Sequence, residues 1–423
     1  MDKRVCDSYI AILKHELVPA LGCTEPIAIA FAAAKARDVL GCFPEHITAW
    51  LSGNMIKNAR SVIVPNSDND RGIETAASLG CTGGDASLQY EVLKPVTEAD
   101  IQKARKLVRD GFCDTRFVDG KNNLYIRIEA FCKDESCSVT VEQEHTNITR
   151  IEKNGKILFS APEGSEPAEG EPDKRLLNVR DICTFASEVA LDDVRDLLER
   201  QITMNTAISE EGLKGCYGAA VGWLLMQVNG DHVEGRAAAR AAAGSDARMN
   251  GCSMPVVINS GSGNQGMTIT LPICEYAQTW GVSHEKTLRA LALANLISIH
   301  IKRFIGNLSA FCGAVSAGCA AACGIAWIDG CSYEQICMCI TNTLCNVGGI
   351  VCDGAKSSCA AKIAAAVNAG TFAYRMAKKG LTFRGGDGLA GEDIETTIEN
   401  IGRMGRDGMH STDIEILNII VGQ

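Results

Sequence analysis

The sequence predicts an α+β N-terminal domain followed by a mostly α-helical C-terminal domain, on three observations. Segments with helical periodicity mix with segments of alternating apolar and polar residues through the first 160 positions. Residues 161–175 then contain three prolines and almost no large apolar side chain, the composition of an exposed connection. Only helix-like segments follow. We therefore expect domains at residues 1–160 and 176–423, joined by an acidic linker at residues 161–175.

The predicted N-terminal domain begins with two helices. The first spans residues 7–19 and ends near Pro19, because proline cannot continue the helical hydrogen-bond ladder. The second starts at Pro26, which suits a first helical turn, and stops before Gly41. A further helix is expected at residues 97–110. Strands are predicted at residues 46–51, 117–118, 124–131 and 136–144.

The predicted C-terminal domain contains one helix of unusual composition. Residues 310–328 carry no charge over nineteen positions, which is long enough for a membrane span. Most of these residues are Ala, Gly, Ser and Cys, which partition into lipid less readily than Leu or Ile, so we favour a buried central helix. The other predicted helices lie at residues 179–200, 212–228, 236–243 and 286–301.

Charge and composition restrict the partners of the protein. The formal net charge is −10, and no run of Lys and Arg is long enough to follow a phosphate backbone. We therefore expect a small-molecule substrate and no nucleic acid. The first ten residues lack the apolar core of a secretory signal, so we expect a cytoplasmic protein with reduced cysteines and no membrane anchor. Homo-oligomerisation stays open.

The cysteines are concentrated in one part of the chain. Nine of the twenty lie between Cys312 and Cys359, yet no C-x-x-C pair occurs, so the close spacing of zinc ribbons and bacterial ferredoxins is absent. Cys352 and Cys359 lie among glycines that permit close backbone approach, as at the rim of a cofactor site. Cys319 and Cys323 fall on one helical stripe and are interpreted as small core residues.

Residues 259–266 read N-S-G-S-G-N-Q-G, a composition that suits an anion-binding loop. Glycines with Ser and Asn present backbone N–H groups and short polar side chains to a phosphate or carboxylate. The alternative is a plain glycine-rich turn before a strand-like run at residues 267–271. The S-G-N at Ser52, Gly53 and Asn54 has the same two interpretations. Asn307 either lines a site or caps the following helix.

Five short motifs run in order along most of the chain. They are L-G-C-T-E-P from residue 21, L-S-G-N from 51, S-G-S-G-N-Q-G from 260, G-N-L-S-A-F-C-G from 306 and C-D-G-A-K-S-S-C-A-A-K from 352. Together they resemble the L-cysteine desulfidase family, which is related to the iron-sulfur L-serine dehydratases of bacteria. The resemblance implies the fold of those dehydratases.

The resemblance also implies a cofactor, a [4Fe-4S] cluster held by Cys312, Cys352 and Cys359. Three protein ligands would leave one iron open, and an open iron acts as a Lewis acid instead of an electron carrier. The loop at residues 259–266 would then hold the carboxylate of an amino-acid substrate. The implied substrate contacts are Ser52, Gly53, Asn54, Ser260, Gly261, Ser262, Gly263, Asn264 and Asn307.

The implied reaction is α,β-elimination from a small L-amino acid, giving pyruvate and ammonia, with sulfide as the third product from L-cysteine. Cys23 matches the position of the base that removes the Cα proton, and a helix N-terminus beside it would lower the thiol pKa. Thr24 and Glu25 are further candidates for proton transfer and substrate binding. The alternative is that Cys23 is a buried turn residue and Glu25 only caps the helix.

Three other functions compete with a cysteine lyase. L-serine is the second candidate substrate, with hydroxide as the leaving group. A pyridoxal-phosphate dehydratase would use S-G-N-Q-G against its cofactor, but it also needs a Schiff-base lysine, usually in a Ser-x-Lys setting, which the lysines of this chain do not supply. A non-enzymatic cysteine-rich protein that stores metal or senses redox state would need exposed thiols, whereas most cysteines here lie in apolar helical segments.

Overall fold

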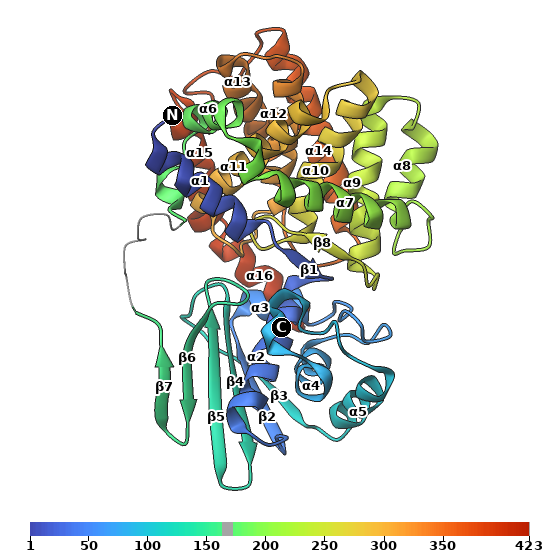
Figure 1. Cartoon of the computed structure of the whole chain (residues 1–423), viewed down its shortest axis with the longest axis vertical. Helices are drawn as coiled ribbons and strands as arrows, with labels where there is room; N and C mark the ends of the chain where they lie inside the picture. The colour runs from blue at the N-terminus through green and yellow to red at the C-terminus, as the bar shows by residue number, and fades with distance from the viewer. Residues whose placement is uncertain (163–171, 423) are drawn as a thin grey trace.

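The computed structural model describes residues 1–162 and 172–422, which form two lobes (Figure 1). A sheet lobe contains most of the first 160 residues, and a helical lobe contains most of the chain after residue 172. The predicted order of a sheet-containing N-terminal region and a helical C-terminal region is confirmed. Most of the predicted linker lies outside the described residues.

The sheet lobe is built on six strands in the order β3-β2-β4-β5-β6-β7. All neighbours are antiparallel except β2 and β3, which are parallel. In β2 the side chains of Ile47, Ala49 and Leu51 are fully buried and alternate with half-buried residues, so this strand has the predicted period of two. The strands are β2 (His46–Leu51), β3 (Cys113–Phe117), β4 (Tyr125–Cys132), β5 (Glu135–Glu142), β6 (Ile148–Lys153) and β7 (Lys156–Ser160).

Helices cover one face of this sheet. The Ala-rich helix α2 (Thr24–Leu40) packs on β4 and β5 and ends at Gly41, whose φ of 82° is the left-handed conformation that closes a helix. Helix α4 (Ile73–Gly83) lies between α2 and α5 (Glu98–Arg109). The short helix α3 (Gly53–Ala59) follows β2 directly, and it faces the helical lobe.

The helical lobe surrounds α12 (Gly313–Ile328), the helix whose composition suggested either a membrane span or a buried centre. All but two of its sixteen residues are buried, and α10, α11, α13 and α14 pack around it. No helix within the described ranges is long and apolar enough to cross a membrane. The helices are α6 (Val179–Glu188), α7 (Arg195–Gly212), α8 (Val221–Asn229), α9 (Val233–Met249), α10 (Gly263–Trp280), α11 (His284–Ile305), α13 (Tyr333–Val347), α14 (Cys359–Lys378) and α15 (Ile394–Arg403).

The two ends of the chain cross between the lobes. Helix α1 (Lys3–Glu16) packs through Tyr9 and Leu13 into the core of the helical lobe. At the other end, α16 (His410–Val421) packs against α3 of the sheet lobe. Between them, strand β1 (Pro19–Leu21) pairs with β8 (Pro255–Val257). These crossings join the two lobes in addition to the linker.

Three sequence predictions in the helical lobe were wrong. The apolar run at residues 267–271 is the buried interior of α10, and a short apolar run cannot distinguish strand from buried helix. The helix predicted at residues 179–200 is interrupted by a short 3-10 helix at Leu191–Asp193, around which Val189, Leu191 and Val194 are buried in the core. Here tertiary packing overrides the helical periodicity. The helix predicted from residue 212 begins only at Val221, because Gly215 and Gly218 before it have positive φ.

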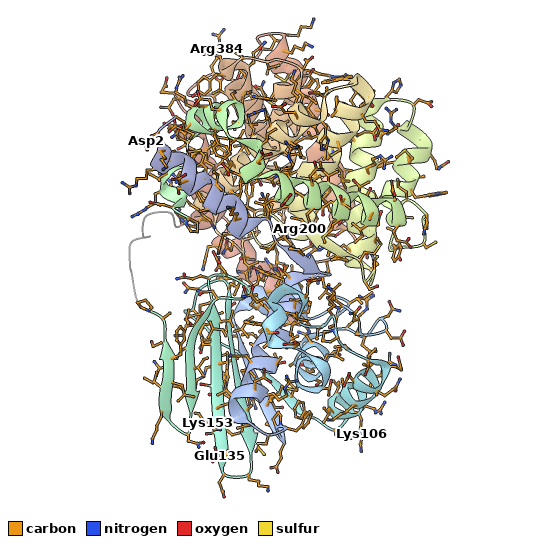
Figure 2. All side chains as sticks on the ribbon, viewed as in Figure 1. Asp2, Lys106, Glu135, Lys153, Arg200 and Arg384 are labelled. Atoms are coloured by element: carbon orange, nitrogen blue, oxygen red, sulfur yellow. The ribbon has the colours of Figure 1, made fainter. Side chains whose placement is uncertain are left out.

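Charged side chains cover the outside of both lobes, as Figure 2 shows for the exposed residues Lys106, Glu135 and Arg384. Inside the helical lobe, by contrast, helices approach closely through glycine. A Cβ added to Gly318 of α12 would lie 2.8 Å from the carbonyl oxygen of Ala366 in α14. The small residues of α12 therefore set the distance between these two helices.

Replacing Gly318 with alanine should destabilise the fold, because the added methyl group forces α12 and α14 apart. We expect a loss of roughly 1–3 kcal/mol, the usual cost of overpacking, and a lower thermal unfolding midpoint. The matched control is Gly349→Ala, since an added Cβ at Gly349 meets no atom within 4 Å. Equal unfolding midpoints for the two variants would show that the close approach of α12 and α14 at Gly318 does not contribute to stability.

Candidate active site

A cavity of about 100 Å³ lies where the two lobes meet. It is lined by residues from α2, α3, α9, α10, α11, α12 and α14 and from the loops before them. Many of the residues that the sequence analysis selected lie here. They are Cys23, Thr24, Glu25, Ser262, Asn264, Asn307, Cys312, Cys352 and Cys359.

The three cysteines reach the cavity from two hydrogen-bonded loops. Cys312 caps the N-terminus of α12, and Cys359 is the first residue of α14. The N–H of Cys312 donates to the Ile350 carbonyl at 3.0 Å, and the N–H of Cys352 donates to the Ala310 carbonyl at 2.7 Å. This backbone bridge holds the loop of Cys352 against the loop of Cys312, which explains how cysteines so far apart in sequence share one cavity.

The thiols lie in an electropositive environment. A hydrogen bond from Cys312 lowers the pKa of Cys352 to about 6, against the opposing effect of burial, and the charges of Lys57 and Lys302 add to the lowering. The same hydrogen bond and burial raise the pKa of Cys312. Lys302 is buried, and no carboxylate in the described parts of the chain lies within ion-pair distance of it. The site therefore favours thiolate on Cys352 and accommodates further negative charge.

Among the described residues, Cys312, Cys352 and Cys359 do not form a group whose sulfurs all lie within 4.8 Å of one another, so they do not make a site for a single ion. Two sulfurs on one zinc ion lie at most about 4.6 Å apart, since each Zn–S bond is about 2.3 Å. Over residues 1–162 and 172–422, only His15, Glu16 and Glu144 form a group of three with all ligand atoms within 4.8 Å, and that group lies outside this cavity. In a cluster each thiolate binds a different iron, so the three cysteines fit a [4Fe-4S] group with one iron free of protein ligands.

The His15, Glu16 and Glu144 group is already satisfied by protein charges. Lys174 forms an ion pair with Glu16 and lies 3.9 Å from Glu144, and His15 lies 3.3 Å from Glu144. An internal ammonium therefore takes the place that a metal ion would need.

Cys23 and Glu25 form a buried pair at the start of α2. The Cys23 thiol donates to Oε2 of Glu25 at 2.8 Å, and Nδ2 of Asn58 donates to Oε1 of Glu25 at 2.9 Å. The hydroxyl of Thr24 donates to the Gly261 carbonyl at 2.9 Å. Glu25 is therefore more than a helix cap, because its carboxylate accepts hydrogen bonds from the side chains of Cys23 and Asn58, which lie on different elements.

The expected lowering of the Cys23 pKa was wrong. Burial, and then the charge of Glu25, raise the pKa of this thiol well above its ordinary value. Burial also acts to raise the pKa of Glu25, but the charge of His145, the hydrogen bond from Cys23 and the charge of Arg248 bring it below its ordinary value. Burial lowers the pKa of His145, so its imidazole is uncharged at neutral pH and does not act on Glu25 there. The hydrogen bond from Cys23 and the charge of Arg248 still lower the pKa of Glu25 at neutral pH. The pair therefore consists of a protonated thiol and an ionised carboxylate.

The glycine-rich loop is a two-residue turn followed by a helix. The backbones of Asn259 and Ser262 exchange two hydrogen bonds of 3.0 and 3.1 Å, and both central residues, Ser260 and Gly261, have positive φ. This is the type I′ geometry. The Ser260 hydroxyl donates to Oδ1 of Asn259, and Ser260 and Gly261 line a separate small cavity beside His145. Their predicted contact with the substrate carboxylate is therefore not made in the main cavity.

The start of α10 has free N–H groups of the kind that bind anions. The first N–H groups of a helix lack intrahelical acceptors. In α10 these are the N–H groups of Gly263, Asn264 and Gln265. Gly263 has a packing role as well, because a Cβ there would lie 2.5 Å from Nε of Arg248. Within the described residues, the buried amide oxygens of Asn264 and Gln265 have no hydrogen-bond partner.

The sequence analysis missed Arg248, a buried cation in the cavity wall. Its Nε donates to the Gly22 carbonyl at 2.8 Å, and 5% of the residue is exposed. No carboxylate lies within ion-pair distance of it in the part of the chain that the structure describes, whereas Arg236 and Arg240 on the same helix both pair with Glu275. Arg248 is thus positioned to bind an acidic ligand. Its place in an Ala-rich helix gave no sign of this in the sequence.

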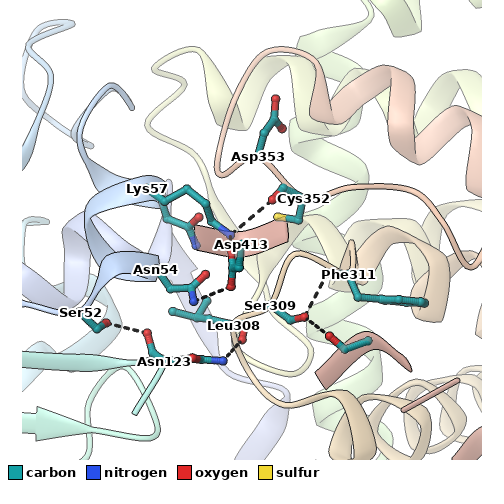
Figure 3. Close-up of polar contacts among 12 residues, drawn as sticks. Ser52, Asn54, Lys57, Asn123, Leu308, Ser309, Phe311, Cys352, Asp353 and Asp413 are labelled. Carbon is teal, nitrogen blue, oxygen red and sulfur yellow. Dashed lines mark hydrogen bonds and ion pairs between the residues drawn. The ribbon is translucent and has the colours of Figure 1, made fainter. Parts of the chain in front are cut away.

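The S-G-N motif lies away from the cavity. Ser52, Gly53 and Asn54 line a second cavity of about 170 Å³ beside His410 and Asp413. The Ser52 hydroxyl donates to the Asn123 carbonyl and Nδ2 of Asn54 donates to Asp413, both at 2.7 Å (Figure 3). These three residues therefore do not line the main cavity, and their contact with a substrate stays a prediction. Asn307 does line the main cavity, and its side-chain amide also donates to the Gln143 carbonyl.

The family match places this chain with the serine dehydratases, which are lyases. The sequence profile of the serine dehydratase alpha chain family matches residues 87–418, so the chain belongs to that family. The family is generally dependent on an iron-sulfur cluster, in agreement with the three cysteines of the cavity.

The chain is also similar over nearly its whole length to proteins named UPF0597. One from Lachnoclostridium phytofermentans is 50% identical over 97% of this chain and 99% of its own. One from Desulfitobacterium hafniense is 47% identical over 99% and 98%. One from Finegoldia magna is 47% identical over 98% and 99%. These names state no substrate, so the comparisons support the serine dehydratase type without choosing between cysteine and serine.

A fully buried amide network holds the Asn259 turn in place. Nδ2 of Asn259 donates to Oδ1 of Asn295 at 2.9 Å, and the side chains of Asn295 and Gln201 exchange hydrogen bonds of 2.8 and 3.0 Å. None of the three residues is exposed. The turn before α10 is therefore held by buried amide groups that cannot form hydrogen bonds with water in place of one another.

Replacing Asn295 with leucine should destabilise the protein, because the amides of Gln201 and Asn259 lose their partners in a dry interior. We expect roughly 1–3 kcal/mol for each group left unpaired, measured by thermal and urea unfolding. The control is Gln102→Leu, which removes an exposed hydrogen bond to Glu98 and should change stability by less than about 0.5 kcal/mol. Similar losses in the two variants would contradict a structural role for the network.

Proposed function

We propose that the protein is an iron-sulfur lyase that catalyses α,β-elimination from a small L-amino acid, with L-cysteine as its substrate. The observation that carries this proposal is that three groups of residues line one cavity. The three cluster cysteines, the Cys23–Glu25 pair and the cation Arg248 all line it. Each part supplies a different requirement of an elimination, namely leaving-group activation, proton removal and substrate orientation.

The carboxylate of the substrate would bind between Arg248 and the N-terminus of α10. Arg248 offers a guanidinium without a carboxylate partner among the described residues, and the helix offers N–H groups and the positive end of its dipole. The unpaired amide oxygens of Asn264 and Gln265 would accept hydrogen bonds from the ammonium group of the same substrate. An amino acid held at both groups presents its Cα toward the centre of the cavity.

Proton removal would use Cys23 and Glu25 together. The thiol is protonated in this environment, and its hydrogen bond to an ionised Glu25 provides the acceptor for its proton. Transfer from sulfur to the Glu25 carboxylate leaves a thiolate, which takes the proton from Cα. Asn58 keeps the second carboxylate oxygen in place during this exchange. The base is then the pair and not the cysteine alone.

A [4Fe-4S] cluster held by Cys312, Cys352 and Cys359 supplies, when bound, an iron without protein ligand that acts as a Lewis acid toward the leaving group. Loss of the Cα proton and of the β substituent gives aminoacrylate, which hydrolyses to pyruvate and ammonia. From L-cysteine the group that leaves is sulfide.

L-serine is the second candidate substrate, and the family match favours it. A serine dehydratase expels hydroxide where a cysteine lyase expels sulfide, and the rest of the reaction is the same. Sulfide is the softer partner for iron, and the similarity of L-G-C-T-E-P to the desulfidase loop supports cysteine.

The first test is anaerobic iron and acid-labile sulfide content with an assay for pyruvate and sulfide on the same sample. We expect about four irons per chain and product from L-cysteine at a higher kcat/KM than from L-serine. Faster turnover of L-serine would select the dehydratase. A protein that holds no iron after anaerobic reconstitution, or that binds iron and turns over neither amino acid, would contradict the lyase and favour a metal-binding or redox protein.

Three variants separate cluster binding from proton transfer. Cys352→Ser should lose the cluster and activity together, because it removes a ligand. Cys23→Ser and Glu25→Gln should keep about four irons and lower kcat by roughly a hundred-fold or more, the usual contribution of general base catalysis. Iron content, the visible absorption of the cluster and product release are measured on each. Loss of iron in Cys23→Ser would place Cys23 with the ligands and remove it as part of the base.

A further inference from the structure

We propose that Lys57, held by Asp413 of the C-terminal helix, is a positioning residue for the Cys352 loop and controls how firmly the cluster is retained. The inference rests on the proposed function, since it concerns the same cysteines. It assigns a role to α3 and α16, which lie between the lobes and contribute no ligand of their own (Figure 3).

Lys57 is a fully enclosed cation that contacts the cysteine loop directly. It lies on α3, and 1% of it is exposed. Its Nζ donates to Oδ1 of Asp413 at 2.6 Å and to the carbonyl oxygen of Cys352 at 3.4 Å (Figure 3). The ammonium thus lies between the C-terminal helix and the backbone of a cluster cysteine.

Asp413 is itself fixed from the sheet lobe. Nδ2 of Asn54 donates to the second carboxylate oxygen of Asp413 at 2.7 Å, so both oxygens are occupied by residues of α3. Asn54 belongs to the S-G-N motif, whose sequence signal is thereby explained by a structural contact. The three side chains tie α16 to α3 immediately beneath the loop of Cys352.

The loop after Cys352 is fitted closely to α3. Gly354 has a φ of 94°, and a Cβ there would lie 2.7 Å from the Lys57 carbonyl oxygen. Lys356 reaches the same carbonyl oxygen at 3.5 Å and the Ser61 hydroxyl at 2.8 Å. The loop therefore contacts α3 at three successive points, of which the Lys57 ammonium is the one nearest the cysteine.

Burying an ammonium group costs free energy of desolvation, and an apolar side chain of similar size would avoid this cost. Packing alone would be satisfied by methionine or leucine at position 57. The charge does what they cannot, because it holds a carbonyl of the ligand loop and adds positive potential beside three thiolates and an anionic cluster. Removing Asp413 would leave the ammonium free to turn away, so the C-terminal helix acts on the cysteine through Lys57.

The test is the rate at which reconstituted protein loses iron to a chelator under anaerobic conditions. Lys57→Met keeps an unbranched side chain one atom shorter and removes the charge, and Asp413→Asn keeps the size and removes the carboxylate. We expect iron loss roughly ten-fold faster in both, with weaker visible absorption of the cluster at equal protein concentration. The matched control is Lys94→Met, which breaks an exposed ion pair with Glu91 and should lose iron as slowly as the wild type.

A second readout uses the protein without iron. The N–H of Cys352 bonds to the Ala310 carbonyl, so hydrogen exchange of residues 350–356 reports how well the loop is held. We expect faster exchange there in both variants, with unchanged exchange in the sheet of the same molecules. If Lys57→Met does not fold, the Asp413→Asn variant decides alone, because it changes only one atom.

The outcomes separate this inference from the proposed function. Wild-type protein that takes up no iron would overturn the cluster, and the exchange measurement would then judge the positioning by itself. Wild-type iron retention and wild-type exchange in the two variants would overturn the role of Lys57. A fall in thermal midpoint with unchanged iron retention would likewise assign the pair to stability alone.

Discussion

Four helices begin at the same cavity, and this convergence is the constraint on which the site depends. Helices α2, α10, α12 and α14 start at Thr24, Gly263, Gly313 and Cys359, and each places residues of its first turn or its cap in the cavity wall. Each N-terminus carries a partial positive charge and unpaired N–H groups. Four of them around one space repel one another, so negative charge placed between them is favourable.

Short pairings between distant segments create this convergence. The antiparallel β1–β8 pair joins Pro19 to Val257, and the turn at residues 259–262 then brings the chain back, so that the Gly261 carbonyl accepts a hydrogen bond from the Thr24 hydroxyl. The starts of α2 and α10 therefore lie close together. The bridge between Phe311 and Val351 does the same for the loops before α12 and α14. Each pairing involves only a few residues, so its register depends on the packed helices around it. The site is therefore as rigid as the helical lobe behind it.

The sequence predicted several residues that line the cavity, but it predicted the ends of the helices less well. Cysteine and glycine motifs led to the cavity because few structures need those residue types together, and Cys23, Cys312, Cys352 and Cys359 all line it. Arg248 escaped notice because its importance lies in lacking a carboxylate partner, which is a property of the folded chain. The S-G-N motif lies at another cavity, where Asn54 contacts Asp413 of α16. Sequence alone does not distinguish a helix start that contacts another helix from one that contacts a ligand. Burial also raises the pKa of Cys23, whereas the sequence predicted a lowered pKa.

That reversal changes how proton transfer and substrate binding are connected. A cysteine with a lowered pKa would carry its charge before substrate arrives, whereas a buried thiol bonded to Glu25 is neutral and the charge lies on the carboxylate. In the proposed mechanism, an amino acid that enters the cavity brings an ammonium group, and its positive charge favours a thiolate on Cys23 by stabilising negative charge nearby. This effect acts on the Cys23–Glu25 pair only when the site is filled. In the empty cavity burial and the charge of Glu25 keep the thiol protonated.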